Sequence, residues 1–403
     1  MSQDSKEWIK SRMTTLKKQT GFAFNEDVFI SVLLCLVSGR DKHLILTAPP
    51  ERLKEVTQLA QQICRCLFGL TTAQFQCHEA QAQNELVDIL FSSKDENNDS
   101  FYKPSSFQKA SRSFHTADFN SSRNTTPKVN RQVNEEAQSN SKQLEDELFH
   151  TTPISPVDFT LKRTKQSPYT SLKTGRRQEN EEKRPTATKI VQALLVEDLD
   201  KADESIQAVL LELMINKELR LSNIRYNVPK PFFLIIAVLP HDFNRRSISA
   251  QLIDRFFISY QFEEEMFQAQ SLSKPFTRRQ ALMRQDEIKA LSDKAKKVHV
   301  HIDISRYVRD IVVGIRTHPR VKGGITARSS QDLVTVIKSL AALFERNFLT
   351  PDLVTIATEK VFSHRLRMLA INERDDQMER EEMDSSIAFD IIAEILHAVN
   401  VPV

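Results

Sequence analysis

The segment at 92–188 constrains the fold more than any other feature, because it divides the sequence into two parts that can fold. Asn, Ser, Gln, Lys and Glu dominate it, aromatic residues are isolated, and no helical or strand periodicity is sustained. Such a composition cannot bury enough apolar surface to offset the entropy lost on ordering. We therefore expect a long disordered insert at 92–188, between foldable parts at 1–91 and 189–403.

The foldable parts predict an α/β core followed by a helical domain. Strand and helix patterns alternate in 1–91 and 189–275, which is typical of a parallel sheet with helical crossovers. The expected strands lie at Leu44–Leu46, Phe75–Cys77, Ile190–Val196 and Phe232–Leu239. The expected core helices lie at Val28–Val37, Arg52–Leu67 and Ala202–Asn216, with Ile248–Phe257 running from helix into strand.

A second, all-helical domain with a charged helical hinge is expected at 276–403. The hinge helix at Phe276–Lys297 leads into Val298–Ile302, where His299 and His301 alternate as on one face of a strand. Helices are expected after it at Ser305–Thr317, Ser330–Arg346, Pro351–Leu369 and Ile387–Val399.

Charge and cysteine content restrict the class of protein. The formal net charge is +3, so no global basic field indicates nucleic acid as a partner. No apolar run reaches the roughly 18 residues of a membrane span. The four cysteines, Cys35, Cys64, Cys66 and Cys77, fit a reduced intracellular protein, and we interpret them as buried thiols. The alternatives are metal sites that use Cys64, Cys66 and Cys77 with His78, or His299 with His301.

The insert carries four Ser/Thr-Pro pairs, beginning at Thr126, Thr152, Ser155 and Ser167. They are candidate sites of proline-directed phosphorylation, which would suggest a eukaryotic source and a cytoplasmic or nuclear location. The alternative is the Pro and Ser enrichment common to disordered segments. We expect the insert to contact protein partners.

A strand followed by two prolines and a lysine lies where a phosphate-binding loop would be. The run begins at His43 and continues through Thr47-Ala-Pro-Pro-Glu-Arg-Leu-Lys54-Glu55, without a glycine. A phosphate loop needs glycines so that consecutive backbone N–H groups can turn toward the phosphates. Ala48, Glu51 and Leu53 occupy the glycine positions, and Glu55 replaces the metal-binding hydroxyl residue. The loop is therefore a degenerate Walker A motif.

Several motifs in order resemble those of AAA+ ATPases, specifically the MoxR and magnesium-chelatase I-subunit branch. They are the Walker B-like Leu194–Ala202, the helix Ile206–Met214, the sensor 1-like strand Phe232–Pro240, Gln251–Phe256 and, in the lid, Gly324–Ser329, His364–Arg367 and Ile392–Val399. The resemblance implies an α/β AAA+ fold: a parallel-sheet nucleotide-binding core and a C-terminal helical lid. It also implies that the protein binds ATP with Mg²⁺ and assembles into an oligomer with AAA+ subunits.

The resemblance assigns roles to individual residues. Pro50, Lys54 and Glu55 match the phosphate loop, and Arg328 matches the sensor 2 arginine of the lid. Glu197 and Asp198 match the Walker B pair in reversed order, with Glu197 as the candidate metal ligand. Arg255 matches the arginine finger, which acts in trans on a neighbour's nucleotide. Sensor 1 lacks its asparagine, since Leu239 or Val238 occupies that place.

Structural interpretations remain open beside these roles. Lys54 could be an exposed lysine at a helix start, and Glu197 and Asp198 could cap a strand end. Arg255 and Arg328 could form structural ion pairs, Arg255 with Asp254 or another neighbour.

Three hypotheses follow. The first is a non-hydrolysing AAA+ subunit or scaffold that lends Arg255 to a competent partner. The second is a slow ATPase with chaperone-like remodelling or chelatase-type motor activity, using Lys54, Glu197 and Asp198. The third is an interaction protein that works through the insert at 92–188.

Overall fold

The computed structural model describes residues 24–91, 189–221, 224–262, 281–369 and 377–402, and also residues 11, 14, 15 and 18. Within 377–386 it describes the backbone only. The predicted insert at 92–188 lies outside the described residues, as does the start of the predicted hinge helix.

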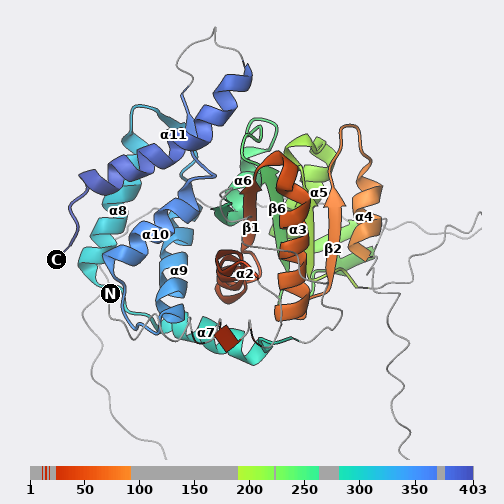
Figure 1. Ribbon diagram of the computed structural model, residues 1–403, viewed down its shortest axis with the longest axis horizontal. Coiled ribbons are helices and arrows are strands. Elements are labelled where there is room, and N and C mark those ends of the chain that lie inside the picture. Colours follow the sequence, from red (N-terminus) through yellow and green to blue (C-terminus); the bar gives the residue numbers. More distant parts are fainter. Residues whose placement is uncertain are drawn as a thin grey trace, which may run out of the picture. The chain divides into compact units, whose positions relative to one another are not determined.

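A five-stranded parallel sheet forms the core, which confirms the predicted α/β class (Figure 1). Its strand order is β2-β3-β6-β1-β7, so the chain crosses the sheet repeatedly through helices. The strands are β1 (His43–Ala48), β2 (Thr72–Gln76), β3 (Ala193–Glu197), β6 (Leu234–Pro240) and β7 (Phe256–Gln261). All their carboxyl ends lie at one edge of the sheet, because every pairing is parallel.

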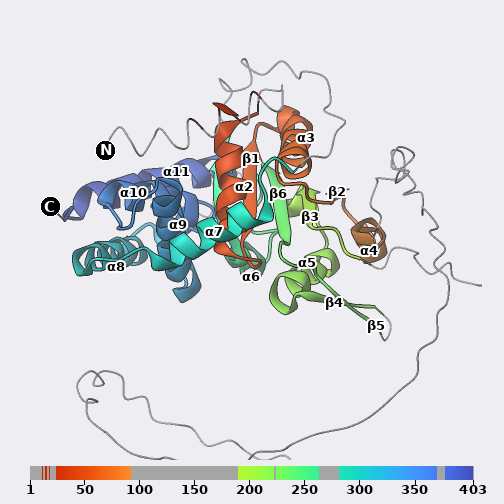
Figure 2. The ribbon, with the colours of Figure 1, turned by 90° about the horizontal axis from the view of Figure 1, so that it is seen from below.

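Helices cover both faces of this sheet, with α2 and α3 on one side and α5 and α6 on the other (Figure 2). These helices, with α4, are α2 (Glu26–Ser38), α3 (Leu53–Gln62), α4 (Gln83–Phe91), α5 (Glu204–Asn216) and α6 (Ala250–Arg255). The Asn25 side chain caps α2 by accepting from the Asp27 N–H at 2.9 Å. A hairpin of β4 (Glu218–Leu221) and β5 (Ile224–Asn227) follows α5.

The central strands β1, β3 and β6 are largely apolar because alternate side chains enter two different hydrophobic clusters. In β1, Leu44 and Leu46 join the cluster that contains α2 and α3, whereas Ile45 joins the cluster that contains α4 and α5. The same alternation runs through β3 and β6.

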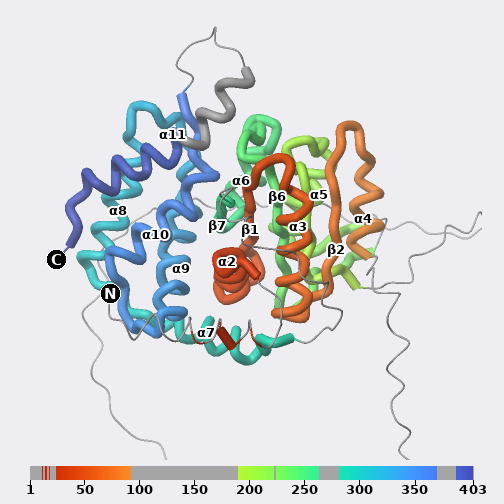
Figure 3. Tube along the Cα trace, viewed as in Figure 1, coloured from red at the N-terminus to blue at the C-terminus, as the bar shows by residue number. Residues whose placement is uncertain are grey.

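The C-terminal part is helical and shares the first of these clusters with α2 and β1. Figure 3 follows its path through α7 (Gln285–Lys297), α8 (Ile302–Thr317), α9 (Ala327–Leu343), α10 (Pro351–Phe362) and α11 (Gln377–Ala398). α7 and α9 pack against α2, and α10 packs against β7. β8 (Val321–Gly323) and β9 (Arg367–Met368), which flank α9 and α10 in the chain, pair as a short antiparallel sheet.

Two expectations about this part are wrong. α10 ends at Phe362 rather than Leu369, because His364 and Arg365 turn into buried polar contacts with the core. Val298–Ile302 is not a strand: His299 makes one isolated bridge to Phe348, and Ile302 already begins α8. His301 instead caps α8, accepting from the Asp303 N–H at 3.4 Å.

All four cysteine thiols are buried and none forms a disulfide, as expected. Cys64 and Cys66 lie in a π-helical turn, Ile63–Leu67, that extends α3. In the described part of the chain, no helix is both long and apolar enough to cross a membrane.

Candidate functional site

The connection between β1 and α3 is a closed turn with few amide groups to offer. Pro49 and Pro50 have no N–H, and Pro50–Arg52 forms a 3-10 turn in which the Arg52 N–H donates to the Pro49 carbonyl at 2.9 Å. α3 begins directly at Leu53, whose side chain is buried in the core. A phosphate group therefore meets no cradle of inward-pointing N–H groups here.

The side chains of this turn do not replace the missing N–H groups as a binding site for phosphate. Arg52 forms an exposed ion pair with Glu55, with Nη1 2.7 Å from Oε1. Lys54 is exposed beside this pair, and Pro50 and Glu51 are also exposed. Glu51 and Glu55 place two carboxylates where a triphosphate would bring further negative charge. The residues present therefore do not fit a conventionally bound ATP with Mg²⁺.

Glu197 and Asp198 lie at the end of β3, at the same edge of the sheet as this turn, with β6 between β3 and β1. Asp198 adopts a left-handed conformation (φ 53°), and its N–H donates to the Val238 carbonyl at 3.0 Å. Its Oδ1 lies 3.1 Å from Lys201 Nζ, and its Oδ2 accepts from Gln76 Nε2 at 3.5 Å. The Asp198 carboxylate thus has local partners.

Neither the metal role nor the sensor 1 role receives further support from neighbouring side chains. Among the described residues, no three His, Cys, Asp or Glu side chains are grouped to hold a metal ion. Val238 and Leu239 are fully buried in β6 and offer no polar group to orient a water molecule.

Arg255 lies at the opposite edge of the sheet, as the last residue of α6 directly before β7. It is half-buried and makes no ion pair with any described residue. Asp254 does not pair with it. The Asp254 carboxylate instead accepts from Thr326 Oγ1 at 2.8 Å, and so links α6 to the cap of α9.

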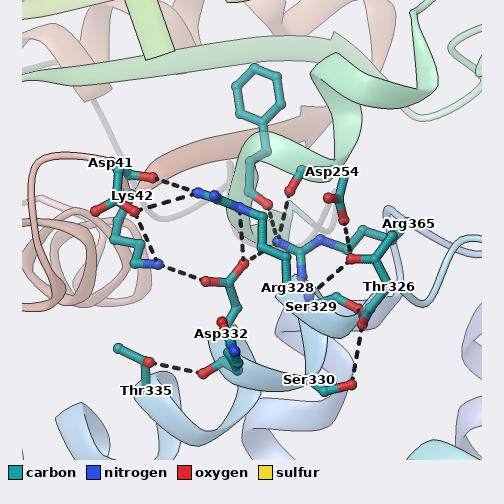
Figure 4. Close-up of polar contacts among 12 residues, drawn as sticks. Asp41, Lys42, Asp254, Thr326, Arg328, Ser329, Ser330, Asp332, Thr335 and Arg365 are labelled. Carbon is teal, nitrogen blue, oxygen red and sulfur yellow. Dashed lines mark hydrogen bonds and ion pairs between the residues drawn. The ribbon is translucent and has the colours of Figure 1, made fainter. Parts of the chain in front are cut away.

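Arg328 lies far from Lys54 along the sheet. Its Nη2 contacts the Asp41 carbonyl at 3.4 Å and Asp41 Oδ2 at 3.5 Å, just before β1 begins (Figure 4). Lys54 follows the other end of β1, and the six residues of that strand span about 20 Å. The structure therefore does not bring Arg328 and Lys54 together.

A buried ion cluster surrounds Arg328, centred on Asp332 of α9. Asp332 Oδ1 lies 2.7 Å from Lys42 Nζ, and Oδ2 lies 2.7 Å from Arg365 Nη2 and 4.0 Å from Arg328 Nε. The Asp332 and Arg365 side chains are 2% and 1% exposed. Arg365 also donates to the Phe256 carbonyl, so the cluster fastens α9 to β1 and β7.

Sequence reasoning did not find this cluster. The signal was available in Asp332, which interrupts an otherwise apolar helical face that includes Leu333, Val336 and Ile337. Its partners could not be identified, because Lys42 lies 290 residues away in the chain.

A second buried polar group joins β7 to the end of α10. His364 Nδ1 lies 3.1 Å from Ser259 Oγ, which lies 2.9 Å from Ser363 Oγ, and His364 Nε2 lies 3.2 Å from the Phe256 carbonyl. Burial, with a contribution from the Arg365 charge, lowers the pKa of His364 well below its usual value.

Comparison with known proteins supports the fold. A family model described as the AAA lid domain matches residues 314–386. The crystal structure of a "putative ATPase" from Cytophaga hutchinsonii superposes with a TM-score of 0.56 at 12% identity, covering 99% of this chain and 98% of that one.

Three curated relatives match parts of the sequence. YeaC from Bacillus subtilis, an uncharacterized protein, is 23% identical over 218 residues, or 52% of this chain and 65% of its own length. Maintenance of telomere capping protein 2 is 33% identical over 89 residues in Lachancea thermotolerans (21% of this chain, 31% of that protein). Its Kluyveromyces lactis counterpart is 33% identical over 82 residues (19% and 30%). The chain spans less than two thirds of the length of each of these relatives.

Proposed function

We propose that this chain, which has an AAA+ fold with an AAA lid domain, is a non-hydrolysing subunit of an oligomeric assembly and lends Arg255 to a neighbour's active site. The observation that carries the proposal is the turn after β1: two prolines, a closed 3-10 turn and two carboxylates replace a glycine-rich cradle. Phosphoryl transfer depends on positioning and charge neutralisation, and this turn has no amide cradle for the phosphates and two carboxylates that offset the charges of Arg52 and Lys54.

Arg255 supports the second half of the proposal. It sits at the edge of the sheet away from its own degenerate loop, and no described carboxylate neutralises it. A half-buried guanidinium that makes no ion pair with a described carboxylate suits a contact with phosphate charge on another subunit. Arg328, in contrast, is engaged by Asp41 and Asp332, so we assign it a structural role in addition to any role in an assembly.

The test is an ATPase measurement on the assembly that a tagged full-length chain recovers from its source cells. We expect Arg255→Ala to lower the ATPase rate of that assembly at least about 10-fold, since arginine fingers contribute large factors to phosphoryl transfer. Arg225→Ala, on the exposed β5, is the matched control and should leave the rate unchanged. An unchanged rate in Arg255→Ala, or recovery of no ATPase with the chain, would contradict the proposal.

A nuclear role is a second candidate. The observation that favours it is the 33% identity to two yeast proteins named for maintenance of telomere capping. Imaging of the fluorescently tagged full chain tests it: nuclear enrichment is expected, and exclusion from the nucleus would contradict it.

A further inference from the structure

A cavity of about 650 Å³ lies between α6 of the core and the paired strands β8 and β9 of the lid. Its core wall is formed by the loop before α6 and by α6 itself, and its lid wall by 322–326 and 364–368. The volume falls within the range of small-molecule sites, which is roughly 300–1,000 Å³. It is separate from the turn after β1, none of whose residues lines it.

Basic side chains dominate the charge of this cavity. Among the described residues, five basic side chains and one carboxylate line it: Arg245, Arg246, Lys322, Arg365 and Arg367, and Asp254. The Asp254 carboxylate is already engaged by Thr326 Oγ1 at 2.8 Å. Arg246, Lys322 and Arg367 are exposed, and none makes an ion pair with a described residue.

The charge behind the cavity has the same sign. Arg365 connects it to the ion cluster, in which Lys42, Arg328 and Arg365 share two carboxylates, Asp41 and Asp332. The cluster therefore retains one positive charge. In a partly enclosed space this potential is screened less than on an open surface, and it favours an anion.

The remaining walls add apolar surface and a close fit of the backbone. Ile248, Ile253, Leu366 and Met368 contribute apolar side chains. Gly324, at φ +110°, lies so close to the Arg365 carbonyl that an added Cβ would be 1.9 Å from its oxygen. Only glycine permits this approach, which sets the distance between the residues after β8 and the segment that follows α10.

We propose that this cavity binds a small organic phosphate, a molecule with a di- or polyphosphate group and an apolar or aromatic body. Arg246 from the core and Lys322 and Arg367 from the lid would contact the phosphate groups, and the aliphatic side chains would contact the body. Because the cations come from both walls, the bound ligand would also hold lid and core together. Such a site lies beyond the proposed lending of Arg255 and does not depend on it.

The experiment is calorimetric titration of the full-length chain with pyrophosphate, ADP and adenosine, with EDTA and at low salt. We expect saturable binding of pyrophosphate and of ADP, with the higher affinity for ADP. We expect no binding of adenosine. Raising the salt concentration should weaken it, and ADP should raise the thermal unfolding midpoint.

Charge reversal locates the site. Lys322→Glu with Arg367→Glu should weaken ADP binding by about 10-fold or more. Both side chains are exposed in the unaltered chain. The neutral pair Lys322→Gln with Arg367→Gln should also weaken ADP binding. Lys289→Glu with Lys294→Glu, on the exposed face of α7, makes the same change in net charge and should leave ADP binding intact.

Several outcomes would overturn the proposal. They are absence of binding to the unaltered chain, retention of binding in both altered pairs, and equal loss in the α7 control. Loss of ADP binding in Lys54→Ala alone would place ADP at the turn after β1 rather than in this cavity. Binding of a phosphopeptide but of neither small phosphate would assign the surface to a protein ligand instead.

Discussion

Asp332 is the residue on which the junction of core and lid most depends. Its side chain is almost fully buried, and its two carboxylate oxygens lie 2.7 Å from Lys42 Nζ and 2.7 Å from Arg365 Nη2. We expect Asp332→Asn to lower the free energy of unfolding by about 3–5 kcal/mol, because it leaves the buried Arg365 charge uncompensated. Urea unfolding measures the change.

Asp293→Asn is the control for that variant, since Asp293 is half-exposed and pairs with Lys296 at 3.1 Å. Its effect should be within about 0.5 kcal/mol. Equal effects of the two substitutions would show that the Asp332 cluster is not what holds the junction.

His43 is expected to make stability depend on pH. It is fully buried in β1, its Nδ1 accepts from the Ile235 N–H at 3.1 Å, and burial lowers its pKa to about 3. In the unfolded chain its pKa is about 6.5, so below that value the unfolded state binds a proton that the folded state does not. The free energy of unfolding therefore falls as the pH drops from about 6.5 toward 3, and His43 contributes a loss of roughly 1.7 kcal/mol between pH 6.5 and 5.0.

His364 should contribute in the same direction, because burial also lowers its pKa. Urea unfolding at pH 6.5 and 5.0 measures the combined loss. In His43→Asn the amide oxygen can accept from the Ile235 N–H. This variant should lose the part of the pH dependence that comes from His43 and keep the part that comes from His364. An unchanged pH dependence in this variant would refute the assignment.

At the scale of elements, the Thr326 side chain at the start of α9 contacts both its own helix and the core. Thr326 Oγ1 accepts from the Ser329 N–H at 3.1 Å and donates to Asp254 Oδ1 at 2.8 Å. Thr326→Val keeps the shape but loses both contacts, and should lower the free energy of unfolding by about 1–2 kcal/mol. Thr326→Ser retains the hydroxyl and should lose much less; similar losses in both variants would argue against this double role.

The elements were largely predictable, for a physical reason. Buried strands such as β3 and β6 are apolar on both faces, and helices such as α5 have one apolar stripe, so local pattern identifies them. The end of α10 was not predictable, because the contacts of His364 and Arg365 that stop it involve residues about 30 to 110 positions away. The β4–β5 hairpin and the β8–β9 pairing were missed because their strands are short and partly exposed.

At the scale of the whole molecule, the sequence identified the motifs but not their arrangement. By sequence pattern, Lys54 and Arg328 belong to the same nucleotide site. In the structure, Lys54 lies beyond the carboxyl end of β1, whereas Arg328 contacts Asp41 before the amino end of β1. The Asp332 cluster and the basic cavity could not be predicted from the sequence, because each is formed by segments that are distant in the chain. The turn after β1 is different: its two prolines and missing glycines were informative already as sequence.

We propose that this chain does not hydrolyse ATP by itself. Phosphate release from ATP with Mg²⁺ by the purified full-length chain, compared with Lys54→Ala, tests this proposal. We expect release no higher than the buffer blank for both proteins, because the turn after β1 lacks a phosphate cradle. Metal-dependent turnover by the unaltered chain that disappears in Lys54→Ala would contradict it and establish a working, if unconventional, ATPase site.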